Sequence, residues 1–476
     1  MLSVVPERNV LPSIFAAACV LLASSLSAAA QSIDARPMRS LSLRDAQRIA
    51  LERSQLVRAQ DASVVAAREM GIAAGQLPDP VVRIGIDNLP IEGADRFSIA
   101  RDFMTMRRIG VAQEVTRAEK RSLRSERFER EAEKTLAEKS AVAASIERDT
   151  ALAWLDRFYA EAALREIAEQ VRLAKMEIEA GEGLFRAGRG SPADLIAARS
   201  TVAVLEDRAR ESAGRIRIAK NALARWVADE ATELGPLPDI TSLDVDTRTI
   251  DAHLGGHPDL QALARQEAIA DVDARLAQAN RRSDWTWEVM FQQRGSSYAN
   301  MVSVGVSIPW QWDRANRQDR EVAAKLAQID EARARREEAT RGHRSELVAM
   351  ISEWETVRER RDRYRDDILR LAGERTIALT SAYRAGRTNS LNDVLVAQRN
   401  ESDVRVQMLA LDAQLAKLWA QIRFTLPHPA ATPAATYPAA TYPAATYPAA
   451  TYPAATYPVS RSSTDAARTA VSQVKP

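Results

Sequence analysis

Cysteine, glycine and aromatic side chains are all scarce in this sequence. Among 476 residues there is one cysteine, there are 18 glycines, and aromatic residues make up 5%. A single cysteine excludes an intramolecular disulfide framework of the kind that holds small secreted domains together. Few glycines, combined with many Ala, Arg, Glu and Leu residues, are typical of long helices rather than of a compact α/β enzyme.

An excess of charge of one sign is also missing. Lys and Arg together number 66, and Asp and Glu together number 64, whereas a nucleic-acid-binding protein carries a clear basic excess. The chain also lacks a nucleophile elbow, a phosphate-binding loop and a His-Glu-x-x-His motif. We therefore expect that the chain is not an enzyme and that it has no cofactor and no nucleic-acid partner.

Histidines give no indication of a metal site. Only His253 and His257 lie close together in the sequence, and Gly255 and Gly256 stand between them. Paired glycines disfavour a continuous helical turn, so the two imidazoles are not expected to share a helical face and one ion. We predict no metal site in the chain.

The N-terminal segment has the pattern of an export signal. Arg8 supplies a positive charge, residues 14–26 form an apolar stretch, and residues 28–30 are all alanine, as at a cleavage site. We expect a signal peptide over residues 1–30, and acylation of Cys19 is the alternative. No later run of 18 apolar residues follows, so any segment that crosses a membrane is expected to be a strand.

Two distant stretches of the chain are nearly the same. Phe185-Arg186-Ala187-Gly188-Arg189 recurs as Tyr383-Arg384-Ala385-Gly386-Arg387. The first is followed by Asp194-Leu195-Ile196 and the second by Asp393-Val394-Leu395. Repetition over such a long period predicts a fold built from two equivalent halves.

Composition places the boundaries of these halves. We expect a first structural repeat over residues 31–232, a Pro- and Asp-rich linker over 233–251, and a second repeat over 252–426. Residues 427–476 include five copies of Ala-Ala-Thr-Tyr-Pro. That composition predicts an extended, disordered tail.

Long stretches without proline predict long helices. Residues 118–185 contain no glycine before Gly181, and a continuous helix of that length would span roughly 100 Å. Residues 317–383 repeat the pattern, and shorter helices are expected over 43–75 and 257–282. In the last helix a heptad seam is expected at Val404, Met408, Leu411, Leu415 and Leu418.

Four segments alternate apolar and polar residues with a period of two, which predicts strands. The alternating residues fall in 82–87, 108–115, 285–292 and 301–310. We expect strands of about 9 to 11 residues, the length that crosses a bilayer at a tilt. Four strands cannot close a barrel, and open edges are excluded from hydrocarbon. If these strands face lipid, several chains must share one barrel; a small soluble sheet is the alternative.

The chain from the end of the signal to about Leu426 resembles the outer-membrane efflux channels of the TolC-like family. The repeated motifs and the Asp that follows each of them carry this resemblance. It implies a mainly α fold with a small β part. Long antiparallel α-helical hairpins would form a trimeric α-barrel tunnel, and four strands per chain would contribute to a shared 12-stranded outer-membrane β-barrel. It also implies an outer-membrane location with a long periplasmic portion.

A second, narrower resemblance is to the heavy-metal branch of that family. Asn88-Leu89-Pro90, Asp95-Arg96-Phe97 and the segment 101–110 carry it. It implies a homotrimer in outer-membrane lipid that serves a proton-driven pump for copper/silver or cobalt/zinc/cadmium. The partners would be a periplasmic adaptor and an inner-membrane RND-type pump. A duct for drugs or for type I protein secretion is the alternative, and a periplasmic adaptor or coiled-coil scaffold is an alternative of another class.

The family resemblance also implies a gate at the periplasmic end. Asp393 would form a ring of carboxylates that favours cations, and Tyr383, Arg384 and Arg387, with Asp194, would hold the closed state. Ordinary roles in turns and on solvated faces are the alternative. The chain reversals that an adaptor would contact are expected at Gly188, Arg189, Gly190, Ser191, Gly386, Thr388 and Asn389.

Overall fold

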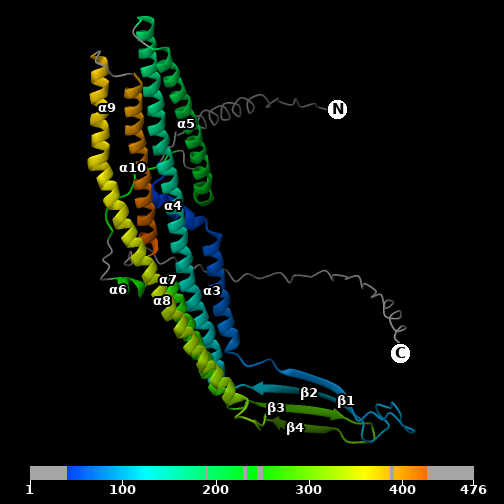
Figure 1. Cartoon of the computed structure of the whole chain (residues 1–476). Helices are drawn as coiled ribbons and strands as arrows, with labels where there is room; N and C mark the ends of the chain where they lie inside the picture. Colours follow the sequence, from blue (N-terminus) through cyan, green and yellow to red (C-terminus); the bar gives the residue numbers. More distant parts are fainter. Residues whose placement is uncertain (1–39, 189–190, 229–232, 244–249, 386–390, 426–476) are drawn as a thin grey trace, which may run out of the picture. The chain divides into compact units, whose positions relative to one another are not determined.

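The computed structural model describes residues 40–188, 191–228, 233–243, 250–385 and 391–425. Within them helices dominate, and the strands form one sheet (Figure 1). This confirms the expected mainly α fold with a small β part. The predicted signal peptide and the predicted disordered tail lie outside the described residues.

The first half of the chain leads from helices through a pair of strands to a long helical hairpin. Its elements are α2 (Leu43–Arg53), α3 (Gln55–Ala74), β1 (Val81–Asp87), β2 (Met106–Val115), α4 (Ala118–Arg186) and α5 (Pro192–Val227). The helix α4 continues without interruption for 69 residues, and α5 packs along it. The long helix predicted after residue 118 is confirmed.

The second half repeats this order of elements. It consists of α6 (Ile250–Leu254), α7 (Pro258–Ala279), β3 (Trp285–Gln293), β4 (Met301–Ser307), α8 (Gln318–Arg363), the π-helical turn η3 (Tyr364–Ile368), α9 (Leu369–Arg384) and α10 (Leu391–Thr425). In each half, shorter helices lead into two strands, and a long helical stretch and a returning helix follow. The order of elements is thus the same in both halves, and the predicted boundaries of the two repeats stay predictions.

Two helices that were expected to be continuous are interrupted. The helix predicted over 43–75 breaks at Ser54, whose hydroxyl accepts a hydrogen bond from the Val57 N–H at 3.3 Å. Serine is a strong N-cap, and no proline or glycine marks the break. In the second half, η3 interrupts the helix predicted over 317–383, as single π-helical turns do inside long helices.

All four strands form one antiparallel sheet in the order β1-β2-β3-β4. Ile109 of β2 lies opposite Ile84 on one side and Phe291 on the other. The strands β1 and β4 have seven residues each, so the expected length of about 9 to 11 residues is wrong for the two outer strands. The apolar alternation in the second half continues to Ile308 and Trp310, beyond the last ladder pair of β4.

The main core lies between α4, α5, α8 and α10. Trp154 and Leu155 of α4 and Leu415 of α10 are fully buried there. Leu415 belongs to the predicted heptad seam, as do the buried Leu411 and Leu418. The predicted linker packs on this core as well, because Ile240 is only 4% exposed.

Candidate functional site

One face of the sheet is apolar and exposed. Residues that lie opposite one another in antiparallel strands project from the same face, so the register builds apolar rows across the sheet. Exposure in these rows ranges from 38% to 77%. The rows are Ile84, Ile109, Phe291 and Val302, and Val82, Val111, Val289 and Val304. An exposed apolar patch of this extent marks a surface that meets another apolar phase or a partner.

Tryptophans border this apolar face on the side of the helices. Trp285 begins β3 directly after α7, and Trp310 and Trp312 follow β4 on the way to α8. All three are exposed, with Trp310 at 83% and Trp312 at 88%. Tryptophan is enriched where an apolar phase meets water.

The opposite face of the sheet is polar and carries ion pairs. Arg83 Nη1 of β1 lies 2.7 Å from Glu288 Oε2 of β3, and Arg108 Nη1 lies 3.1 Å from Asp87 Oδ2. Between Arg83 and Glu288 the strand β2 presents Gly110, where an added Cβ would lie 2.5 Å from the Val289 carbonyl oxygen. The sheet is therefore amphipathic, with charge on one face and aliphatic side chains on the other.

Both outer strands of the sheet pair on one side only within the described chain. β1 pairs with β2, and β4 pairs with β3. Such edges leave backbone N–H and C=O groups that another strand can satisfy. In an apolar phase those groups must be paired, so a lipid-facing sheet of this kind requires strands from neighbouring chains.

A buried ion pair joins the sheet to the long helix α4. Lys120 Nζ lies 2.8 Å from Asp284 Oδ2, and the Arg117 N–H donates to Asp284 Oδ1 at 3.0 Å. The side chains of Lys120 and Asp284 are 4% and 16% exposed. Burial alone would raise the pKa of Asp284, but the hydrogen bonds from Lys120 and Arg117 outweigh it and hold that pKa below its usual value.

The two long helices α4 and α9 end in the same way. Each is closed by an alanine, Ala187 or Ala385, whose N–H donates to the carbonyl oxygen four residues earlier. Gly188 follows with φ +72°, a conformation that favours glycine. Ser191 precedes Pro192, which occupies the first position of α5. The other predicted contact residues, Arg189, Gly190, Gly386, Thr388 and Asn389, lie outside the described residues, as does Arg387.

Tyr383 lies where the two hairpins meet. Burial raises the pKa of Tyr383, and the carboxylates of Glu177 and Asp194 raise it further. Both carboxylates therefore lie near enough to act on the Tyr383 phenol. The family resemblance implied Asp194 at this gate, and Glu177 is a residue that sequence reasoning missed. The apolar neighbours at this point are Ile178 of α4, Ala198 of α5 and Leu395 of α10.

The two remaining gate residues that the structure describes, Asp393 and Arg384, are exposed near the hairpin ends. Asp393 lies in the first turn of α10 and Arg384 in the last turn of α9. Polar contacts join the two hairpins further along: Arg208 Nη1 of α5 lies 3.0 Å from Asp403 Oδ1 of α10. The roles of Asp393 and Arg384 in gating stay predictions, because all of the described contacts lie within a single chain.

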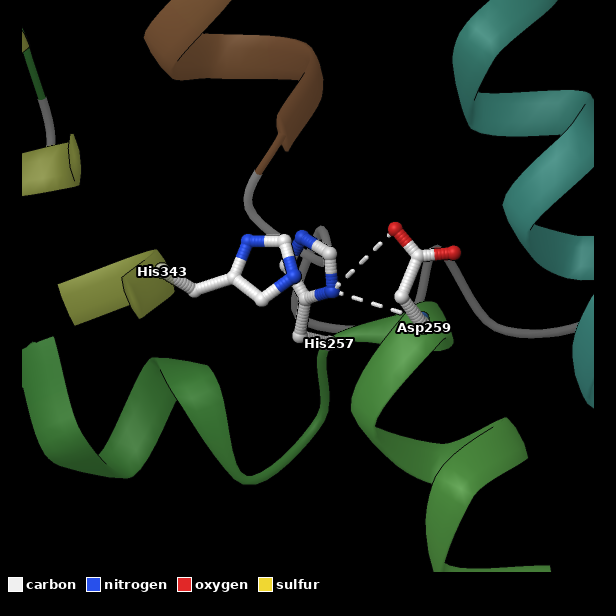
Figure 2. Close-up of side chains that lie close together, drawn as sticks. All are labelled: His257, Asp259 and His343. Carbon is white, nitrogen blue, oxygen red and sulfur yellow. Dashed lines mark hydrogen bonds and ion pairs between the residues drawn. The ribbon is translucent and has the colours of Figure 1, made fainter. Parts of the chain in front are cut away.

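A group of histidine and aspartate side chains lies where α7 begins, beside α8. His257 caps α7 and is 5% exposed, and its ring centroid lies 4.4 Å from that of His343. Figure 2 shows the two imidazoles side by side, with Asp259 facing His257. The prediction of no metal site considered His253 as the partner of His257; the structure instead pairs His257 with His343 and Asp259 in one group of possible ligands. Only folding brings His257 and His343 together, so the sequence carried no signal for it.

No helix among the described segments has both the length and the apolar character needed to cross a membrane.

Comparison with known proteins shows similarity in fold. No protein-family model and no curated protein matches the sequence. The outer-membrane channel OprN is 19% identical, with a TM-score of 0.66 over 80% of this chain and 89% of that one. CusC, whose structures describe transmembrane channel formation, is 14% identical with a TM-score of 0.68, over 80% and 91% of the chains. The outer-membrane protein VceC from Vibrio cholerae is 18% identical with a TM-score of 0.65, over 80% and 95%.

Proposed function

We propose that this chain is a subunit of a TolC-like outer-membrane efflux channel. Three copies would close one 12-stranded β-barrel and one α-helical tunnel, through which substrate passes passively to the exterior. The fold that the chain shares with OprN, CusC and VceC supports this proposal. The repeated motifs at the ends of α4 and α9 support it from the sequence.

The observation that carries the proposal is the amphipathic sheet with two open edges. Its exposed aliphatic rows suit lipid hydrocarbon, and its tryptophans suit the membrane interface. Its charged face suits a water-filled lumen. Because the outer strands β1 and β4 each lack one neighbour in the described chain, closure would join β4 of one subunit to β1 of the next.

The helices fit the periplasmic part of such a channel. α4 starts directly after β2 and continues for 69 residues, a length of roughly 100 Å at 1.5 Å per residue. Its far end, with the ends of α5, α9 and α10, would lie deep in the periplasm. There we place the contacts with a periplasmic adaptor and an inner-membrane RND-type pump, and a gate that includes Tyr383, Asp194 and Asp393.

Heavy-metal cations are the proposed substrate. The support is the resemblance of residues 88–90, 95–97 and 101–110 to the heavy-metal branch of the family. A ring of Asp393 carboxylates at the narrow end would favour cations over anions. A deletion strain tested against copper, silver, zinc, cadmium and cobalt, beside a panel of drugs, examines this assignment. Sensitivity to drugs alone would contradict it and would favour a drug duct.

Two substitutions on β4 test the membrane assignment. Val304 lies 73% exposed in the apolar rows, and its neighbour Ser303 projects from the polar face. Arginine on the lipid face near the bilayer centre costs about 2–4 kcal/mol, so Val304→Arg should reduce the heat-resistant oligomer in outer-membrane fractions. Ser303→Arg, the matched control, should assemble normally. Equal assembly of both variants, or a native mass of one chain for the detergent-extracted protein, would contradict the proposal.

A further inference from the structure

We propose that His257, Asp259 and His343 bind one divalent transition-metal ion, with Zn²⁺ as the representative. The site would lie where α7 begins, beside α8. Neither the strands of the sheet nor the hairpin ends contribute a residue to it. It is separate from the proposed channel function, because a duct for any substrate could contain it.

The positions of the donor atoms carry the proposal. One ligand atom from each of the three residues lies within 4.8 Å of the other two. In a tetrahedral zinc site, bonds of about 2.0–2.2 Å place donors roughly 3.4 Å apart. The donors must therefore approach one another by about an ångström in response to the ion. Asp259 has the freedom to do so, since its side chain is 57% exposed.

The environment of the two imidazoles also suits a metal. The two ring centroids lie 4.4 Å apart, and neutral imidazole nitrogen is a common metal ligand. His257 is only 5% exposed, which shields the ion on one side. Asp259 and the half-buried His343 leave a path for it on the other.

The carboxylate groups nearby set the charge of the site. Asp259 Oδ2 lies 3.9 Å from His257 Nδ1, and Glu346 follows one turn after His343 on α8. Two imidazoles and one carboxylate form a three-residue ligand set of the kind that leaves a fourth position for water. Imidazole nitrogen favours zinc, copper(II) or nickel over calcium and magnesium, which take oxygen ligands.

A purely structural role for His257 is the competing explanation. Its Nδ1 accepts a hydrogen bond from the Asp259 N–H at 3.3 Å and so caps α7. Capping alone, however, requires neither the second imidazole nor the Asp259 carboxylate. The experiment therefore targets these two groups and leaves the cap in place.

The test is a Zn²⁺ titration of the full-length protein, purified in detergent without a histidine tag and stripped with a chelator. We expect one Zn²⁺ per chain by calorimetry, and a visible spectrum of four-coordinate Co²⁺ when Co²⁺ replaces Zn²⁺. His343→Ala and Asp259→Asn should each weaken Zn²⁺ affinity at least tenfold. His253→Ala, the matched histidine control outside the cluster, should bind as the unaltered protein does.

Circular dichroism of each variant establishes that it is folded, and alanine at position 343 is compatible with the middle of α8. Absence of stoichiometric Zn²⁺ binding to the unaltered protein would overturn the proposal. Unchanged affinity in a folded His343→Ala protein would overturn it as well. Loss of binding in His253→Ala alone would place the ion elsewhere and overturn this assignment.

Discussion

Arg83 of β1 reaches across β2 to Glu288 of β3, with 2.7 Å between Arg83 Nη1 and Glu288 Oε2. The two strands are not neighbours, since β2 lies between them. The pair passes over Gly110 and Ala112, which lie opposite Arg83 and Glu288 in the ladder. Small residues on this face of β2 therefore allow charges from β1 and β3, the strands on either side of β2, to meet.

If the polar face lines a lumen, this ion pair contributes to ion selectivity. Glu288→Gln leaves the Arg83 charge without its partner, so the reversal potential in planar bilayers should shift in the direction of higher anion selectivity. Arg83→Gln should shift it in the direction of higher cation selectivity. The double variant should return close to the unaltered channel, because the two charges cancel. Identical reversal potentials in all four proteins would exclude this face from the conducting path.

The close approach of strands at Gly110 predicts a packing defect. An added Cβ at Gly110 would lie 2.5 Å from the Val289 carbonyl oxygen and 2.6 Å from Met290 Cγ, and backbone must move to accommodate it. Overpacking of this kind costs about 1–3 kcal/mol, so Gly110→Ala should lower the temperature at which the oligomer dissociates.

Gly305→Ala is the matched control for Gly110→Ala. Its added Cβ would meet only the side chain of Glu288, 3.0 Å from Oε1 and 3.1 Å from Cγ, and no backbone atom. We expect a smaller change in the dissociation temperature, measured by heating before electrophoresis in mild detergent. A larger effect at Gly305 than at Gly110 would contradict the observed register of β2 and β3.

The buried pair of Lys120 and Asp284 predicts a pH-dependent stability. Asp284→Asn leaves the Lys120 charge buried without a carboxylate, which costs about 3–5 kcal/mol. The hydrogen bonds that lower the folded-state pKa of Asp284 stabilise the protein above the unfolded-state pKa of about 3.9. That stability is lost as the pH falls through the folded-state pKa.

The difference between Asp284→Asn and the unaltered protein should therefore be full at pH 7 and should shrink below about pH 4. Denaturant unfolding followed by circular dichroism measures it. Glu52→Gln, which breaks the exposed i,i+4 pair with Arg48, is the control and should cost at most about 1 kcal/mol. A difference that persists unchanged at pH 3 would show that the carboxylate charge is not its source.

Local patterns in the sequence were sufficient for most of the elements. Period-two alternation located β1 to β4, and the absence of proline and glycine located α4, because both signals act over neighbouring residues. Ser54 broke a predicted helix because its hydroxyl caps α3, which composition alone does not reveal. The family resemblance implied that Tyr383 and Asp194 belong to the same gate, and that role stays a prediction.

Contacts between distant residues could not be predicted in the same way. Glu177, near the C-terminal end of α4, acts electrostatically on Tyr383, and His343 of α8 lies beside His257. Each contact depends on how helices pack, and neither residue belongs to a recognisable motif. Consequently the sequence identified the hairpin ends but not the full set of groups around Tyr383, and it missed the histidine cluster.

Tyr383 is the strongest candidate for holding the proposed gate closed. It packs against the cluster of Ala198 and Leu395, which belong to two other helices. A tyrosine hydroxyl is already neutral near pH 7, and burial and the nearby carboxylates raise the pKa of Tyr383 further. A neutral phenol can donate a hydrogen bond to an acid.

Two substitutions separate the roles of the ring and the hydroxyl. Tyr383→Phe keeps the ring and removes the hydroxyl. Loss of one hydrogen bond costs about 0.5–1.5 kcal/mol, which changes an opening equilibrium by up to roughly tenfold. Tyr383→Ala removes the packing as well, so open probability in planar bilayers should rise in the order unaltered, Tyr383→Phe, Tyr383→Ala. Tyr298→Phe, in the turn between β3 and β4, should match the unaltered channel. If Tyr383→Ala leaves open probability unchanged, the hairpin contact is structural and the gate must depend on other residues, with Asp393 the next to test.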